Sequence, residues 1–370
     1  MKLNVELLEK MCNGFGPSGY ENEVQKFVRD YGGKYAEEVL YDRTGSVIFR
    51  HGNAKPKIML AGHCDEIGFV VSSIEESGYL RISNIGGWWD QTLLSQEILI
   101  RPFKHDEKII GVIAAKPSHV LKEEERKKVI TMDKMFVDIG CKSAEEVKKL
   151  GIRVGDPAVP HAFFRTMKRV RKGDENKKEH KVTLAVAKAF DNRIGAFIVL
   201  EVLRRLAEEN IKHPNTVYGV STVQEEVGLR GARTAAQMIK PDIGFAIDVD
   251  ISGDVPGTKE IDQEMGEGVC ISAGDSSMIP NPRLRKYVID LAEEKDIKWQ
   301  TSFLKRGGTD AGIIHITGIG APSLFLGIAT RHIHSHHSIL DLGDVESAIQ
   351  LLVEIIKNLD GETAASFTVL

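Results

Sequence analysis

The chain has 370 residues, of which 42% are hydrophobic, so it is long enough for a large core and for two domains. Its 49 basic and 53 acidic residues nearly balance, which excludes the strong overall field that draws proteins to nucleic acid or to membrane surfaces. No apolar run is long enough to span a bilayer, and the acidic residues near the start are atypical of a signal peptide. With few, widely spaced cysteines (Cys12, Cys64, Cys141, Cys270), the composition predicts a cytoplasmic protein with reduced thiols.

The first 68 residues show an α/β pattern. Two helices and then two strands are predicted, at residues 4–12, 21–31, 46–52 and 55–63. The link between the helices contains Gly14, Gly16 and Gly19 in the spacing of a dinucleotide-binding fingerprint. No predicted strand precedes these glycines and Pro17 interrupts them, so we interpret the segment as a loop before the second helix.

Residues 69–164 have a different texture. Short alternating strands are separated by Gly and Pro, with one short helix at 143–151 among them. This pattern predicts a small β-rich, barrel-like domain. The charged segment that follows, KRVRKGDENKKEH at 168–180, is typical of a solvated loop or hairpin tip.

The α/β pattern then resumes. Helices are predicted at 192–210, 230–239, 282–295 and 343–359, and strands at 216–223, 243–250 and 321–328. Strands that alternate with helices indicate a mixed, largely parallel sheet covered on both faces. We therefore predict one α/β domain, formed by residues 1–68 and 165–370, with the β-rich domain of residues 69–164 inserted into it.

Polar side chains follow several of the predicted strands, where open α/β sheets bind their ligands. His63 and Asp65 end one strand and are two residues apart, so an extended chain places them on the same side. A metal-bound histidine commonly donates its other N–H to a carboxylate, and this pair supplies both groups. Asp191 precedes an apolar helix, where capping the helix is the ordinary alternative to binding a metal.

Glu225 and Glu226 end a second apolar strand. Burying two unpaired carboxylates is costly, but a divalent cation would offset one of them and leave the other to act as a base. A solvated surface pair is the alternative. Asp248 and Asp250 end a third strand and share one face, so one or both could reach the same cleft or form a turn.

Four histidines follow the last buried strand, and their spacing alone does not choose among them: His332, His334, His336 and His337. Imidazoles and carboxylates without a cysteine pair suit zinc, cobalt or manganese in a hydrolytic site. Five such positions exceed one tetrahedral zinc and fit two ions that share a bridging carboxylate. The HExxH, Walker and GxSxG motifs are absent from the sequence.

These residues lie in motifs that resemble the M42 metallo-aminopeptidases, which include the tetrahedral and glutamyl-aminopeptidase types. The motifs occur in the family's order over nearly the whole chain: FGPSGYE, AGHCDEIGF, KAFDNRIG, QEEVGLRGA, AIDVDISGDVPG, GGTDAG and TRHIHSH. The resemblance implies a zinc-exopeptidase-like fold. It also implies that the inserted domain mediates dimerisation and that dimers can assemble into a tetrahedral dodecamer.

The resemblance also implies roles for individual residues. One of two divalent ions would be held by His63, Asp191 and Asp248, and the other by Asp191, Glu226 and His334, with Asp191 bridging. The Ile-His-Ser context selects His334 among the four histidines; His332 stands where the family pattern has Tyr. Glu225 would be the general base and Asp65 would orient His63. The implied substrates are peptides with a free N-terminus.

Three other functions remain as alternatives. One is hydrolysis of N-acyl amino acids or other amides on the same fold. A second is glycoside hydrolysis, which needs two carboxylates that flank a glycosidic bond and not a metal set with histidines. A third is a metal-binding scaffold without catalysis, against which the presence of Glu225 argues.

Overall fold

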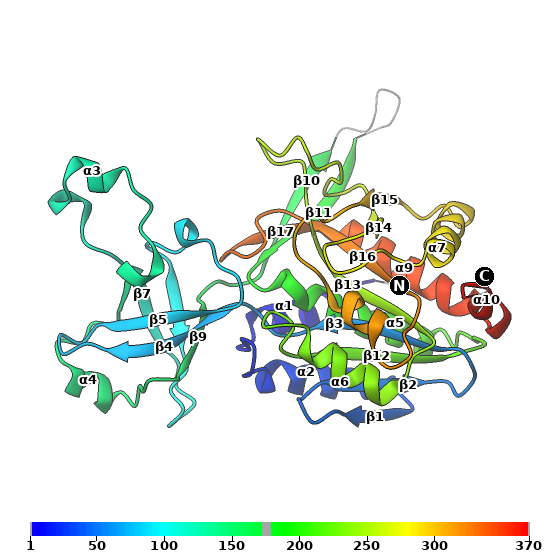
Figure 1. Cartoon of the computed structure of the whole chain (residues 1–370), viewed down its shortest axis with the longest axis horizontal. Coiled ribbons are helices and arrows are strands. Elements are labelled where there is room, and N and C mark those ends of the chain that lie inside the picture. The colour runs from blue at the N-terminus through cyan, green and yellow to red at the C-terminus, as the bar shows by residue number, and fades with distance from the viewer. Residues whose placement is uncertain (1, 172–178, 369–370) are drawn as a thin grey trace.

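A computed structural model describes residues 2–171 and 179–368. It shows an α/β body joined to a smaller closed β-barrel, which stands to one side of the body in Figure 1. The predicted fold, a mixed α/β sheet with a barrel-like insertion, is confirmed. Within the described residues, no helix is both long and apolar enough to cross a membrane.

The body is built on an eight-stranded sheet with the order β1-β2-β12-β3-β13-β16-β14-β15. In that order the strands are Glu38–Tyr41, Val47–His51, Thr216–Thr222, Lys57–His63, Ile243–Ile251, Ser323–Thr330, Val269–Ser272 and Trp299–Ser302. The four central strands, β12, β3, β13 and β16, are parallel to one another. Their carboxyl ends therefore meet at one edge of the sheet.

Helices cover both faces of this sheet (Figure 1). One face carries α1 (Val5–Asn13), α2 (Asn22–Gly32), α5 (Phe190–Glu208), α7 (Pro282–Glu294) and α9 (Leu342–Asn358). The other face carries α6 (Arg230–Ile239) and α8 (Asp310–Ile316). Strand β3 shows the division, because its side chains alternate. Ile58 and Leu60 pack in the larger core around α5, whereas Met59 and Ala61 pack in the smaller core under α6.

The barrel closes through the strand order β4-β5-β8-β7-β6-β9. In chain order its strands are β4 (Gly68–Ile74), β5 (Leu80–Ile85), β6 (Glu97–Ile100), β7 (Ile109–Ala114), β8 (Phe136–Asp138) and β9 (Pro157–Pro160). Its helices are α3 (Glu123–Arg126) and α4 (Ala144–Lys149). The barrel has its own hydrophobic core, which includes Phe69, Val71 and Ile98. All of these strands lie within or next to the predicted insertion.

A three-stranded sheet lies beside the main one. It pairs β10 (Arg165–Arg171), β11 (His180–Ala187) and β17 (Ser338–Asp341) in antiparallel fashion. The first two strands form a hairpin that includes part of the charged segment 168–180. The sequence predicts a loop or hairpin tip over the whole segment 168–180, but residues 168–171 belong to β10 and β11 begins at His180; residues 172–178 lie outside the described residues. A short helix, α10 (Gly361–Ser366), follows α9 near the end of the chain.

Candidate metal centre

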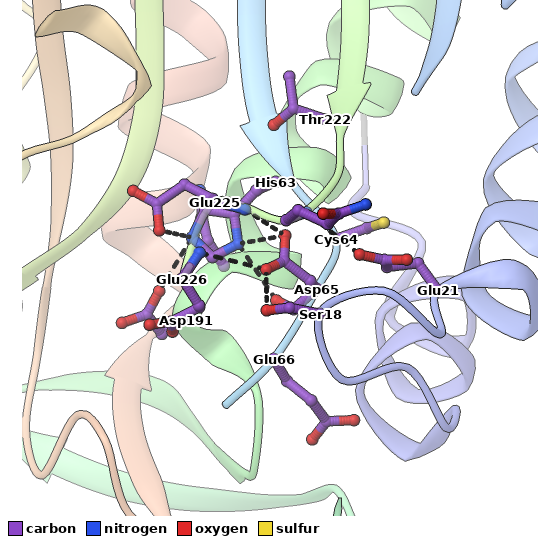
Figure 2. A network of polar contacts seen from close by, with 12 residues as sticks. Ser18, Glu21, His63, Cys64, Asp65, Glu66, Asp191, Thr222, Glu225 and Glu226 are labelled. Carbon is purple, nitrogen blue, oxygen red and sulfur yellow. Dashed lines mark hydrogen bonds and ion pairs between the residues drawn. The ribbon is translucent and has the colours of Figure 1, made fainter. Parts of the chain in front are cut away.

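A cavity of about 540 Å³ opens at the carboxyl edge of the parallel strands. Its lining includes Asp191, Glu225, Glu226, Asp248 and His334, and His63 lies buried behind them. The structure therefore brings all five predicted metal ligands and Glu225 together. Figure 2 shows most of this group.

His63 is the last residue of β3 and is only 1% exposed. Its Nε2 lies 3.2 Å from Oδ1 of Asp191, 3.5 Å from Oε2 of Glu225 and 3.6 Å from Oδ2 of Asp248. This buried nitrogen has no partner in good hydrogen-bond geometry. Its other nitrogen, Nδ1, lies 3.1 Å from the backbone oxygen of Asp65 and 3.4 Å from Oδ1 of the same residue. The ring is thus held from one side while Nε2 faces a ring of carboxylates.

Two glycines bring Asp191 to His63. An added Cβ at Gly62 would lie 2.3 Å from the backbone carbon of Gly195, so α5 and β3 touch main chain to main chain. Asp191 lies in the first turn of α5 with a non-helical backbone. The capping bond there belongs to Asn192, whose Oδ1 accepts from the N–H of Gly195 at 2.9 Å. Asp191 is therefore free of the capping role, and its carboxylate faces the two histidines.

Asp65 fixes the two adjacent glutamates. Its carboxylate accepts the backbone N–H of Glu225 at 3.1 Å and of Glu226 at 3.2 Å, and the hydroxyl of Ser18 at 2.6 Å (Figure 2). The chain has left β12 after Thr222, so the strict alternation of a strand no longer separates these neighbours. Both glutamate side chains reach the same site, and the surface-pair alternative does not fit their burial, since their side chains are 10% and 6% exposed.

His334 enters from the loop after β16. Its Nε2 lies 3.0 Å from Oδ2 of Asp191 and 3.5 Å from Oε1 of Glu226. The other histidines of the cluster do not join the site. His336 is buried against the ring of Trp88, with ring centroids 5.5 Å apart, and His332 and His337 are exposed.

Asp250, the alternative to Asp248, points elsewhere. Its Oδ1 accepts the backbone N–H of Ile251 at 2.8 Å and the side-chain amide of Gln263 at 3.1 Å. Asp248 alone of the two lies close to His63.

The ionisable groups of the site have strongly shifted pKa values. Burial raises the pKa of Glu225 and of Asp248 well above the usual carboxyl range, and burial with the charge of Asp191 raises the pKa of Glu226 to about 8. Burial alone would lower the pKa of His334, but the neighbouring carboxylates outweigh it and raise the value to about 10. Ionising all of these carboxyl groups together is therefore unfavourable with only the two histidines of the described site to balance them, and a bound cation would favour their ionised forms.

Among the residues that the structure describes, two groups of three ligand atoms are close enough together to hold a metal ion. They are His63, Asp191 and Glu226 in one case, and His63, Glu225 and Asp248 in the other, with all atoms of a group within 4.8 Å of one another. Buried atoms without hydrogen bonds, Nε2 of His63 and Oε1 of Glu226, lie in these groups. Imidazole nitrogen and carboxylate oxygen are ordinary ligands of zinc and related ions, so the donor set fits a metal.

Some residues around the site escape the sequence analysis. Asp310, at the start of α8, is buried and accepts the hydroxyl of Thr222 at 2.6 Å. Glu66 accepts hydrogen bonds at 2.7 Å from Lys188 and from Arg193, all three buried. These residues could have been found from the sequence because they lie within the family motifs. Glu66 follows Asp65 in AGHCDEIGF, and Asp310 lies in GGTDAG. Lys188 and Arg193 lie on either side of Asp191 in KAFDNRIG.

Known proteins share this fold over nearly the whole chain. A solved TET aminopeptidase from the marine sediment archaeon Thaumarchaeota archaeon SCGC AB-539-E09 is 46% identical, with a TM-score of 0.92 over 98% of this chain and 99% of that one. The TET1 peptidase of Pyrococcus horikoshii, described as able to assemble into a tetrahedron or a large octahedral shell, is 29% identical, with a TM-score of 0.81 over 96% and 99%.

Sequence comparison agrees with the structural likeness. A lysyl aminopeptidase from Pyrococcus furiosus is 33% identical over 96% of this chain and 98% of its own length. The family model of the M42 glutamyl aminopeptidases matches residues 45–351, which span both the barrel and most of the body. The chain therefore belongs to the M42 family of aminopeptidases.

Proposed function

We propose that this aminopeptidase removes N-terminal residues from peptides at a centre of two divalent metal ions. One observation carries the proposal: two imidazoles and four carboxylates converge at the carboxyl edge of the sheet, and buried ligand atoms among them lack hydrogen bonds. Zinc or cobalt suits this donor set, and manganese is also compatible with it.

The contacts of Asp191 support a shared ligand. Its Oδ1 faces His63 and its Oδ2 faces His334, so one carboxylate reaches both sides of the site. We assign His63 and Asp248 to one ion and Glu226 and His334 to the other, with Asp191 bridging. This division follows the histidines; proximity alone also groups His63 with Glu226.

Glu225 is the residue we assign to proton transfer. Bound ions would supply positive charge that polarises the scissile carbonyl and lowers the pKa of a nucleophilic water. Glu225 accepts the proton of that water and then delivers it to the leaving amine. Its backbone N–H is fixed to Asp65, which keeps its carboxylate at the site, where Oε2 lies 3.5 Å from Nε2 of His63.

The closest competing activity is hydrolysis of N-acyl amino acids or other amides. A side-by-side assay of free-amine peptides, the same peptides with an acetylated N-terminus and carboxymethyl-cellulose separates the possibilities. Cleavage of the free-amine peptides alone, one residue at a time, is expected. Cleavage of the acetylated series instead would overturn the aminopeptidase assignment, and a lack of turnover with every substrate would favour a scaffold.

We further propose that residues 69–164 form a separate dimerisation domain and that the chain forms homo-oligomers, up to a tetrahedral dodecamer of six dimers. The assembly described for the Pyrococcus horikoshii relative supports this, as does the barrel's separate core. Replacing the insertion with a short linker should reduce the particle mass measured by light scattering. We also propose that the protein acts in the cytoplasm, where its four free cysteines would stay reduced.

A further inference from the structure

The barrel makes a direct contact with the candidate metal centre. The Nδ1 atom of His334 lies 2.7 Å from the backbone oxygen of Gly87, which belongs to the segment that follows β5. Gly87 also lines the cavity. We use the name barrel turn for residues 84–88. The contact joins two parts of the chain that are 247 residues apart.

The barrel turn approaches the site with its backbone. An added Cβ at Gly87 would lie 3.2 Å from Nδ1 and 3.3 Å from Cε1 of His334. At Gly86 it would lie 3.2 Å from Oε2 of Glu226 and 2.6 Å from Cγ2 of Ile67. Gly86 also has a φ of 75°, which favours glycine. The two glycines thus lie against the two side chains assigned to the same ion.

The barrel turn is held in place from both ends. The side-chain amide of Asn84 donates to the backbone oxygen of Gly86 at 2.7 Å. The indole N–H of Trp88 donates to the backbone oxygen of Gly68 at 3.0 Å, and its ring stacks on Phe69 with centroids 4.7 Å apart. The carbonyl of Gly87 is therefore fixed relative to the barrel core and not only to the loop of His334.

We propose that the barrel turn is a positioning element for His334, and this inference rests on the proposed two-metal function. A carbonyl that accepts the Nδ1–H of a histidine fixes the tautomer in which Nε2 carries the free lone pair. Here the Nε2 atom is the one that faces Asp191 and Glu226. The barrel thereby completes the ion site on the His334 side, while the His63 side is built wholly from the body.

The variant Gly87→Ala tests this inference. Gly87 does not have a left-handed backbone, so alanine adds a methyl group against His334 without straining the turn. Gly361→Ala is the matched control, because the Cβ there would meet only one atom, at 3.9 Å. Asn84→Ala is a second variant that touches neither ligand and loosens the turn by removing its internal hydrogen bond.

The readouts are metal binding by calorimetry and mass spectrometry, with Co²⁺ as the probe, and thermal unfolding of the metal-free protein. We expect Gly87→Ala to lower the affinity for the ion on the His334 side by about 10–100-fold. Mutation of a group that supports a metal ligand from behind usually has an effect of this size. The other ion and the melting temperature of the metal-free protein should match the control. Excess Co²⁺ should restore kcat, and Asn84→Ala should show the same change to a smaller degree.

Two results would overturn the inference. One is wild-type binding of both ions by Gly87→Ala. The other is an equal loss of affinity for both ions together with a lower melting temperature, which would indicate that the substitution destabilises the whole fold. Either result leaves the proposed function standing as long as the wild-type protein binds two ions. If the wild-type protein binds none and still cleaves peptides, the proposed function itself fails.

Discussion

The two histidines of the site are held in different ways. His63 ends a central strand and is 1% exposed. Its ring lies next to Asp191 because the main chains of β3 and α5 touch there. His334 lies on a loop with a φ of 54°, its side chain is 37% exposed, and its Nδ1 contacts a carbonyl from the barrel. One side of the site is therefore built into the sheet, and the other depends on a contact between two separately packed parts of the molecule.

Metal removal should produce the largest effect and should reveal this difference directly. Stepwise chelation is expected to remove the ion on the His334 side first, because His334 is more exposed than His63 and lies on a loop instead of a central strand. Prolonged chelation should abolish peptide hydrolysis, and Co²⁺ or Zn²⁺ should restore it. Metal content by mass spectrometry, measured in parallel with activity, checks both points. Simultaneous loss of the two ions would erase the distinction, and full activity without metal would disprove the mechanism.

The adjacent glutamates should fail differently when changed to glutamine. Glu225→Gln removes the proton acceptor but keeps the shape, so kcat should fall by roughly 10²–10⁴-fold with both ions retained and KM nearly unchanged. Glu226→Gln replaces an anionic ligand with a neutral one, so the affinity for the ion on the His334 side should fall. A high metal concentration should partly restore activity. Metal loss in the Glu225 variant instead would show that the two roles are exchanged. Unchanged activity and metal content in both variants would show that neither glutamate takes part in the reaction or in metal binding.

The His63 side should be sensitive to the buried ion pairs beneath it. Glu66→Gln leaves Lys188 and Arg193 without their shared carboxylate, and removing one partner of a buried pair typically costs about 3–5 kcal/mol. Arg193 also donates to the backbone oxygens of Gly14 and Cys64, so the loop that carries Ser18 should loosen as well. Urea unfolding compares this variant with Glu97→Gln, whose side chain is 54% exposed in its pair with His161. Equal midpoints would contradict the prediction.

The smallest expected effect is a change in the pH dependence of stability, caused by Asp344, which does not line the cavity. Burial raises the pKa of Asp344 to about 7, above its value in an unfolded chain. Folding then takes up a proton between about pH 4 and pH 7, so this residue's contribution to stability is lost as pH rises through 7. The slope contributed by one such proton is at most about 1.4 kcal/mol per pH unit.

Asp344→Asn should reduce the change of the melting temperature with pH between about pH 5 and pH 8. This expectation concerns the slope and holds even if the substitution also shifts the average melting temperature. Asn cannot titrate, although it also alters the bonds from Gly266 and Gly268. Asp262→Asn, at an exposed position, serves as the control. A slope that matches the control would show that Asp344 does not hold this proton.

The sequence predicts the long elements well. The helices at 192–210 and 343–359 and the strand at 243–250 are confirmed to within a few residues, because long runs of apolar side chains leave few alternatives. The four-residue strands β14, β15 and β17 escape prediction. Such short segments carry too little periodicity, and only their neighbours in the sheet define them.

The residues of the site also divide into those that the sequence predicts and those that only the packing of the chain defines. His63, Glu225 and the pair Asp248 and Asp250 are predicted from their positions at strand ends, the choice of Asp248 came from the family resemblance, and the structure brings His63, Glu225 and Asp248 together. Whether they bind metal stays a prediction. Ser18 and Gly87 could not be found this way, because they reach the site through the packing of a loop and of the barrel. The choice of His334 came from the family resemblance, since what separates it from His336 is the course of the loop and the ring of Trp88.

The close approach of Gly62 and Gly195 has a consequence for sequence divergence. An added Cβ at Gly195 would lie 2.1 Å from the backbone oxygen of Ile247, so α5 touches β13 as directly as it touches β3. The spacing of His63, Asp191 and Asp248 is therefore set by peptide geometry and not by the volumes of core side chains. Aliphatic residues elsewhere in the core can drift over long evolutionary times without moving these three groups apart, whereas a single methyl group at either glycine would separate them.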